Sequence, residues 1–188
     1  MQTTTLLRDL QQRTQDVIKR ITPLQDVSDA LLNFQSSPKS WSALECLEHL
    51  NRYGDFYLNE MEQQIQQSRH KAAPTFQTGW LGNWFANSVA DKPKINTMPS
   101  PPSMNPTGSQ VDRQVIDTFL QQQSRMLVLL DRAAEVDLTK TKTGITLTRW
   151  IRLRLGDTLR VVIYHNQRHV SQALRAVATA QQTAPQSA

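Results

Sequence analysis

Two histidines near the C-terminal end of the chain have a spacing that suits a metal site. His165 and His169 are four residues apart in residues 164–172, a segment with a strong helical pattern. Residues four apart on an α-helix lie on nearly the same face, so both imidazoles can point at one spot. Neutral imidazole is a good ligand for zinc, nickel and iron alike. The pair therefore marks a candidate metal centre.

A third histidine, His49, lies in a second helical segment at residues 41–68. It follows its expected helix cap, Ser42, by seven residues, and His165 follows Asp157, near the expected start of the last helix, by eight. Both lie about two turns, roughly 10–12 Å, into their helices. If they share a metal, the two helices run parallel. The spacing then predicts three histidine ligands and an open coordination position. The alternative is that the histidines are separate interior or surface residues, and His70, 21 residues beyond His49, is expected to be exposed.

The elements that would position these histidines are helices. Amphipathic patterns of helical period predict four of them, at residues 3–20, 42–68, 110–135 and 156–180. Ser42 and Glu45 have the spacing of a capping box at the start of the second helix. We therefore predict an all-α fold, a four-helix bundle in up-down-up-down order. It forms a single domain over residues 1–180, and residues 181–188 fray.

A long Pro-rich connection separates the second and third predicted helices. Prolines and glycines recur through residues 70–109 and exclude a long helix there. An apolar island at residues 80–89 predicts a short helix docked on the bundle, followed by an extended Pro-rich arm. Because long unstructured loops are unusual in compact domains, we expect this segment to be packed or buried in a partner. Residues 137–155 form another connection, with some extended character.

Positive charge gathers in the last part of the chain. The net charge is +5, and residues 149–175 hold six arginines against one acid, Asp157. These arginines either form a solvated basic face or attract an anionic small-molecule substrate, for which we single out Arg149, Arg152 and Arg154. Nucleic acid is disfavoured as a partner because no recognition motif and no interleaved aromatic residues are present.

Composition also bears on where the protein works. A single cysteine, Cys46, excludes an intramolecular disulfide. No apolar run approaches the roughly 20 residues that span a bilayer, and the N-terminus lacks the layout of a signal peptide. We expect a cytoplasmic protein that does not enter the membrane.

Several residues near the histidines could assist or compete with them. Tyr53 is one turn from His49 and Gln172 one turn from His169, so either could orient a water, a substrate or a ligand imidazole. Core packing and a polar contact on the helix face are their alternative roles. Cys46 could be a nucleophile or ligand, but its position beside the helix cap favours packing. Glu45 is better explained by capping, and Glu48 is turned about 100° away from His49, so no protein general base is predicted.

The motifs as a set resemble one protein family. Residues 41–50 read Trp-Ser-Ala-Leu-Glu-Cys-Leu-Glu-His-Leu, and residues 165–172 read His-Asn-Gln-Arg-His-Val-Ser-Gln. A Trp-Ser helix start leading to one histidine, then two histidines four apart in the last helix, resembles the DinB superfamily. The resemblance implies a four-helix bundle, often a homodimer, with His49, His165 and His169 on a divalent metal. Characterised relatives include bacillithiol transferases and mycothiol-dependent maleylpyruvate isomerase, which use low-molecular-weight thiols.

Three functions follow as hypotheses. The first is a divalent-metal-dependent enzyme, a thiol-dependent S-transferase or a related metal-centred transferase or hydrolase. The second is a non-catalytic metal-binding module for ligand binding or stress response, whose pocket is plugged by side chains. The third is a metal-free structural dimer with residues 80–89 and the Pro-rich arm as its interface. For an enzyme, we expect the mouth of the site at residues 35–41 and 137–155.

Overall fold

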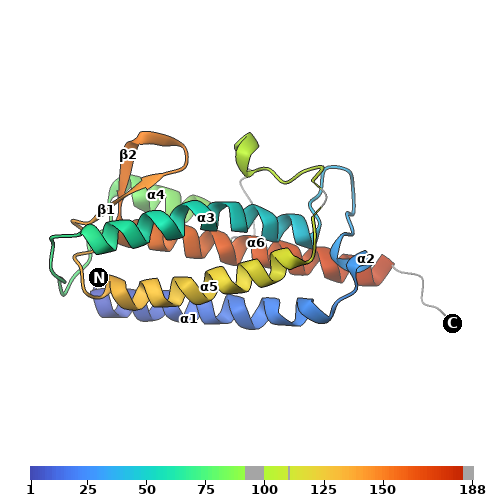
Figure 1. Cartoon of the computed structure of the whole chain (residues 1–188), viewed down its shortest axis with the longest axis horizontal. Coiled ribbons are helices and arrows are strands. Elements are labelled where there is room, and N and C mark those ends of the chain that lie inside the picture. Colours follow the sequence, from blue (N-terminus) through green and yellow to red (C-terminus); the bar gives the residue numbers. More distant parts are fainter. Residues whose placement is uncertain (92–99, 110, 184–188) are drawn as a thin grey trace.

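Four long helices dominate the part of the chain that this computed structural model describes, which is residues 1–91, 100–109 and 111–183 without the side chain of Arg149. They lie side by side (Figure 1) and are α1 (Thr3–Ile21), α3 (Ala43–Gln67), α5 (Gln114–Ala133) and α6 (Leu155–Thr183). Helices α1 and α3 each pack against both α5 and α6. The fold is therefore mostly helical, as predicted.

Helix α3 begins at the predicted place. The Ser42 side chain accepts a hydrogen bond from the Glu45 amide, and the Glu45 carboxylate accepts one from the Ser42 amide. This capping box satisfies amide groups that have no partner inside the helix. It sets the start of α3, and with it the position of His49 along the helix.

The directions of the long helices differ from the prediction. One buried cluster joins the end of α1, the starts of α3 and α5 and the end of α6, through residues that include Ile21, Leu44, Phe119 and Val177. The other buried cluster joins the opposite ends. Helices α3 and α5 therefore run parallel, and α6 runs antiparallel to both (Figure 1). The up-down-up-down order is wrong, because the long connection between α3 and α5 returns the chain to the end where α3 starts.

The remaining described elements are short. They are the 3₁₀ helices η1 (Thr22–Asp26) and η2 (Pro102–Met104), the helices α2 (Asp29–Leu32) and α4 (Trp80–Val89), and the strands β1 (Lys142–Ile145) and β2 (Thr148–Arg154). The strands form an antiparallel hairpin. The all-α prediction omitted this hairpin and expected only extended character there. The amide of Gly144 donates to Glu60 across 2.7 Å, so the hairpin is held by the second half of α3, a contact distant in sequence.

Helix α4 docks on α6, as the apolar island predicts. The buried carboxylate of Asp157 accepts a hydrogen bond from the Gly79 amide across 2.8 Å at the start of α4. A β-carbon at Gly82 would lie only 2.4 Å from the Asp157 carboxyl carbon, so glycine permits this close approach. Trp80, 84% exposed, points outward. The interface role expected for this helix in a homodimer remains a prediction.

The described part of the Pro-rich arm packs beside the start of α3. Arg52 donates to the Asn105 carbonyl across 2.9 Å, and the Trp41 indole donates to the Thr107 hydroxyl across 2.8 Å. Residues 92–99 of the arm lie outside the described residues. None of the described helices is both long and apolar enough to cross a membrane.

Candidate metal centre

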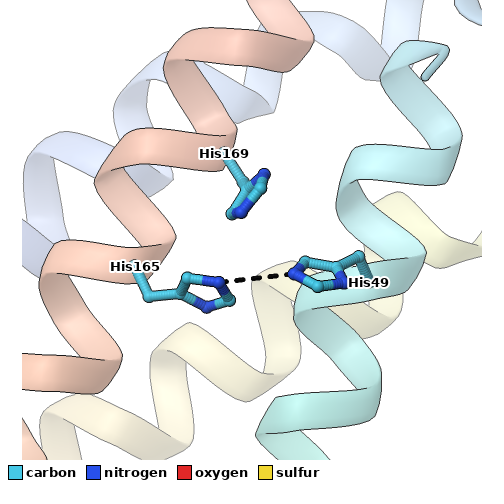
Figure 2. Close-up of side chains that lie close together, drawn as sticks. All are labelled: His49, His165 and His169. Carbon is cyan, nitrogen blue, oxygen red and sulfur yellow. Dashed lines mark hydrogen bonds between the residues drawn. The ribbon is translucent and has the colours of Figure 1, made fainter. Parts of the chain in front are cut away.

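Three histidine rings meet between α3 and α6. His49 comes from α3, and His165 and His169 come from successive turns of α6 (Figure 2). One ring nitrogen of each lies within 4.8 Å of the others. The Nε2 atoms of His49 and His165 are 3.3 Å apart, the contact drawn as a dashed line. The structure thus brings together the three histidines that the sequence singles out.

The rings meet although the two helices are antiparallel. Antiparallel helices align a residue near the start of one with a residue farther along the other. His49 lies near the start of α3, whereas His165 and His169 lie near the middle of the 29-residue α6. The equal depth of His49 and His165 in their helices, which favoured a parallel pair, therefore has no bearing on the site.

Hydrogen bonds set the orientation of two of the rings. The Nδ1 atom of His49 lies 2.6 Å from the carbonyl oxygen of Met104, and Nδ1 of His169 lies 3.0 Å from Oε1 of Gln172. A carbonyl or amide oxygen only accepts, so each Nδ1 carries the proton and each Nε2 keeps its lone pair. Both lone pairs are then available to a metal ion, the arrangement in which an outer partner orients a ligand. Gln172 thus contacts a histidine ring, which is one of the roles that the sequence left open for it.

Burial keeps the three imidazoles neutral. Mainly through desolvation, the pKa of His49 is lowered to about 4 and that of His169 to about 3. The pKa of His165 is also lowered well below its usual value, by burial and by the two neighbouring histidines. Neutral imidazole is the form that binds metal, so no imidazolium has to lose its proton at neutral pH. The set has the composition of a site for zinc, nickel or iron.

Aromatic side chains flank the histidines. The Tyr53 ring lies 5.0 Å from the His49 ring and 4.9 Å from the His165 ring, centroid to centroid. Burial raises the pKa of Tyr53 to about 12, so its hydroxyl keeps its proton. Trp41 lies 4.8 Å from His49 and 5.7 Å from His169. The sequence predicted Trp41 at the start of the helix and within the loop at the mouth of the site, but its contact with His169 has no signal in the local spacing.

Other reactive groups stand apart from the histidines. Among the described residues, the cluster that could hold a metal contains no cysteine and no carboxylate. Cys46 is fully buried, and burial raises its pKa to about 12. Glu45 caps α3, Glu48 pairs with Arg52 across 2.8 Å, and His70 is exposed. These outcomes agree with the roles expected from the sequence.

A cavity of about 570 Å³ opens onto the three rings. Both loops expected at its mouth contribute to its wall, through residues 39–41 and 145–147. They do so from opposite ends, because α3 and α6 are antiparallel and their starts lie far apart. The described part of the Pro-rich arm adds to the wall through residues such as Pro101 and Asn105.

The cations near the cavity are not those selected from the sequence. Arg152 donates to Gln64, and Arg154 donates to the Gln77 carbonyl. Neither lines the cavity, and the side chain of Arg149 lies outside the described residues. The lining cations are instead Lys39, Arg168 and Arg175. Composition does not reveal in which direction the side chains of the hairpin and of α6 point. It therefore could not identify which cations line the cavity.

Comparison with known proteins yields one family. The family model that describes the DinB superfamily matches residues 6–173, which is most of the chain. No curated protein and no solved structure matches. The chain belongs to the DinB superfamily.

Proposed function

We propose that this member of the DinB superfamily holds one divalent metal ion on His49, His165 and His169 and uses it in a metal-dependent reaction of a small molecule. The preferred reaction is transfer of a low-molecular-weight thiol to an electrophile, and hydrolysis is the related alternative. The observation that carries the proposal is the convergence of three ring nitrogens within 4.8 Å of one another. We further propose that the four long helices form the four-helix bundle expected of the family.

The residues fit such an ion. The Nε2 atoms of His49 and His165 are 3.3 Å apart, which is close enough to share a proton. A metal ion would take the place of that shared proton. Met104 and Gln172 accept the protons on Nδ1 of His49 and His169, which leaves the inner nitrogens free. Three neutral ligands would leave the ion's charge uncompensated and a coordination position open.

The metal, when bound, would supply Lewis acidity that lowers the pKa of a thiol or water. The protein supplies the surroundings. Trp41 and Tyr53 pack against the rings and limit the access of water to them. The protonated Tyr53 hydroxyl can donate a hydrogen bond to a reacting group. Because no aspartate or glutamate is found among the described residues that line the cavity, none of these residues offers a carboxylate base.

The open cavity favours an enzyme over a non-catalytic metal site. A purely structural or storage site needs no space beside the ion, and a plugged pocket would be expected for it. Here a cavity of about 570 Å³ reaches the histidines, within the range of sites that take small molecules, about 300–1,000 Å³. This space would admit a thiol and its electrophile together.

Metal content tests the proposal. Protein purified without a tag and incubated with zinc or nickel is expected to retain about one equivalent by plasma mass spectrometry, and the His165→Ala variant is expected to lose it. His70→Ala is the matched control, because His70 is exposed and lies outside the cluster. Loaded wild-type protein would then be assayed for thiol-dependent turnover of electrophiles. Wild-type protein that takes up no metal, or retention of metal by His165→Ala, would refute the site.

A further inference from the structure

The cavity is long and runs between the two helices that carry the histidines. Along α3 its lining extends from His49 to Tyr57, about 12 Å, and along α6 from Val161 to Arg175, about 21 Å. Because the helices are antiparallel, Tyr57 and Val161 lie at one end and Arg175 lies at the other. The histidines stand between the two ends.

The end beside the hairpin is apolar. Its wall includes Tyr57, Ile145, Leu153 and Val162, each at most 7% exposed. The Tyr57 hydroxyl accepts a bond from the Thr146 amide across 3.4 Å and lies 3.5 Å from the Thr146 hydroxyl. The polar side-chain atoms of Tyr57 and Thr146 thus already have partners. An apolar group buried there would gain free energy with each methylene removed from water.

The opposite end is cationic. Lys39 and Arg175 line it, and neither forms an ion pair with a described residue. Arg168 also lines the cavity, and it donates to the Ser88 carbonyl across 3.3 Å. Acidic side chains are missing from the described part of the wall, so no described residue of the wall offsets the charge of Lys39 and Arg175. A ligand group placed here should carry negative charge.

We propose that the cavity binds an amphiphilic anion, with a carboxylate or phosphate group beside Lys39 and Arg175 and an apolar body against Tyr57 and Val162. The middle of such a molecule passes His49, His165 and His169. This inference names the substrate class of the proposed enzyme and rests on the proposed function for the reaction. Binding itself rests on the two unlike ends of the cavity.

Calorimetric titration of the full chain with simple amphiphiles tests the inference, on protein treated with chelator and on zinc-supplemented protein. Saturated carboxylates from hexanoate to dodecanoate should bind with an affinity that rises by up to about fourfold per buried methylene. Decanol, which lacks the anion, should bind about fivefold to tenfold more weakly than decanoate. Comparing the affinity for decyl phosphate with that for decanoate identifies the preferred anionic group.

Paired variants assign the cationic end. Replacing both Lys39 and Arg175 by methionine should lower the affinity for decanoate to that for decanol. Replacing Arg8 and Lys19 by methionine is the matched control, because it removes the same charge from the exposed face of α1 and should leave the affinity unchanged. Both double variants alter exposed positions, so folding is retained and circular dichroism verifies it.

Three results would overturn the inference: an affinity independent of chain length, equal affinities for decanoate in the two double variants, or loss of decanoate binding when the metal is removed. The last result would make the carboxylate a direct metal ligand. Protein that binds decanoate but never takes up metal would refute the metal centre and leave the amphiphile site standing. The two proposals therefore fail separately.

Discussion

His49 donates a hydrogen bond from Nδ1 to the carbonyl oxygen of Met104 across 2.6 Å. This contact joins a residue of α3 to the Pro-rich arm, 55 positions later in the chain. Arg52, one turn after His49, donates to the Asn105 carbonyl and so holds the same part of the arm. The orientation of one proposed ligand therefore depends on a segment that α3 itself anchors.

Arg52 is expected to act as a positioning residue. Arg52→Ala should free the arm and loosen the Met104 carbonyl from His49. Zinc affinity should then fall by up to about tenfold. Direct loss of an outer partner of a metal ligand lowers metal affinity by about 10- to 100-fold, and Arg52 acts on the outer partner only indirectly. Arg52→Lys keeps one donor and should restore part of the affinity. Competition with a chelating dye measures it.

Arg13→Ala is the control for this prediction, since Arg13 also forms an ion pair with a carboxylate four residues away, Asp9. Both alanine variants lose a surface ion pair, worth less than about 1 kcal/mol of unfolding free energy. Only Arg52→Ala should change zinc affinity. Equal zinc affinities in the two variants would show that Arg52 serves stability alone.

Gln172 is expected to support His169 in the same way. Gln172→Ala removes the acceptor of the Nδ1 proton and should lower zinc affinity about 10- to 100-fold. Gln172→Glu restores an acceptor with more negative charge and should bind zinc at least as tightly as wild type. The same dye competition measures both variants, and wild-type affinity in Gln172→Ala would contradict the role.

Cys46 is expected to be unreactive and dispensable for metal binding. Its burial and its pKa of about 12 predict no labelling by a disulfide reagent at pH 8 until urea unfolds the chain. Cys46→Ala should keep its zinc and lose about 1 kcal/mol of unfolding free energy. Loss of zinc from this variant would place the thiol in the site.

The metal-free protein is expected to lose stability as the pH falls below about 6.5. In the unfolded chain histidine takes up a proton near that pH, whereas the folded pKa is about 4 for His49 and about 3 for His169. Between these values the unfolded state binds more protons, so each histidine lowers the unfolding free energy by up to about 1.4 kcal/mol per pH unit.

Urea titrations from pH 7.5 to pH 4.5 measure this dependence. His49→Gln should show a shallower decline than wild type, because one buried imidazole is removed. His70→Gln should follow wild type, since His70 is exposed in the folded state. Parallel curves for His49→Gln and wild type would mean that His49 takes up its proton equally well in the folded chain.

Local patterns in the sequence were enough to predict the long helices and the members of the histidine cluster. Apolar periodicity and capping are local properties, so the capping box of Ser42 and Glu45 located the start of α3. The spacing of His165 and His169 places both on one face of α6 whatever surrounds them. The motifs at residues 41–50 and 165–172 correctly indicated the family to which the chain belongs.

The orientation of these parts depends on tertiary contacts. Apolar periodicity identifies the face of a helix that is buried but not the direction in which the helix packs, so the antiparallel pairing of α3 with α6 was missed. The hairpin is held by Glu60, the His49 ring is oriented by the Met104 carbonyl, and Lys39 and Arg175 line the same cavity. Each of these arrangements brings together residues far apart in the chain, which no local pattern encodes.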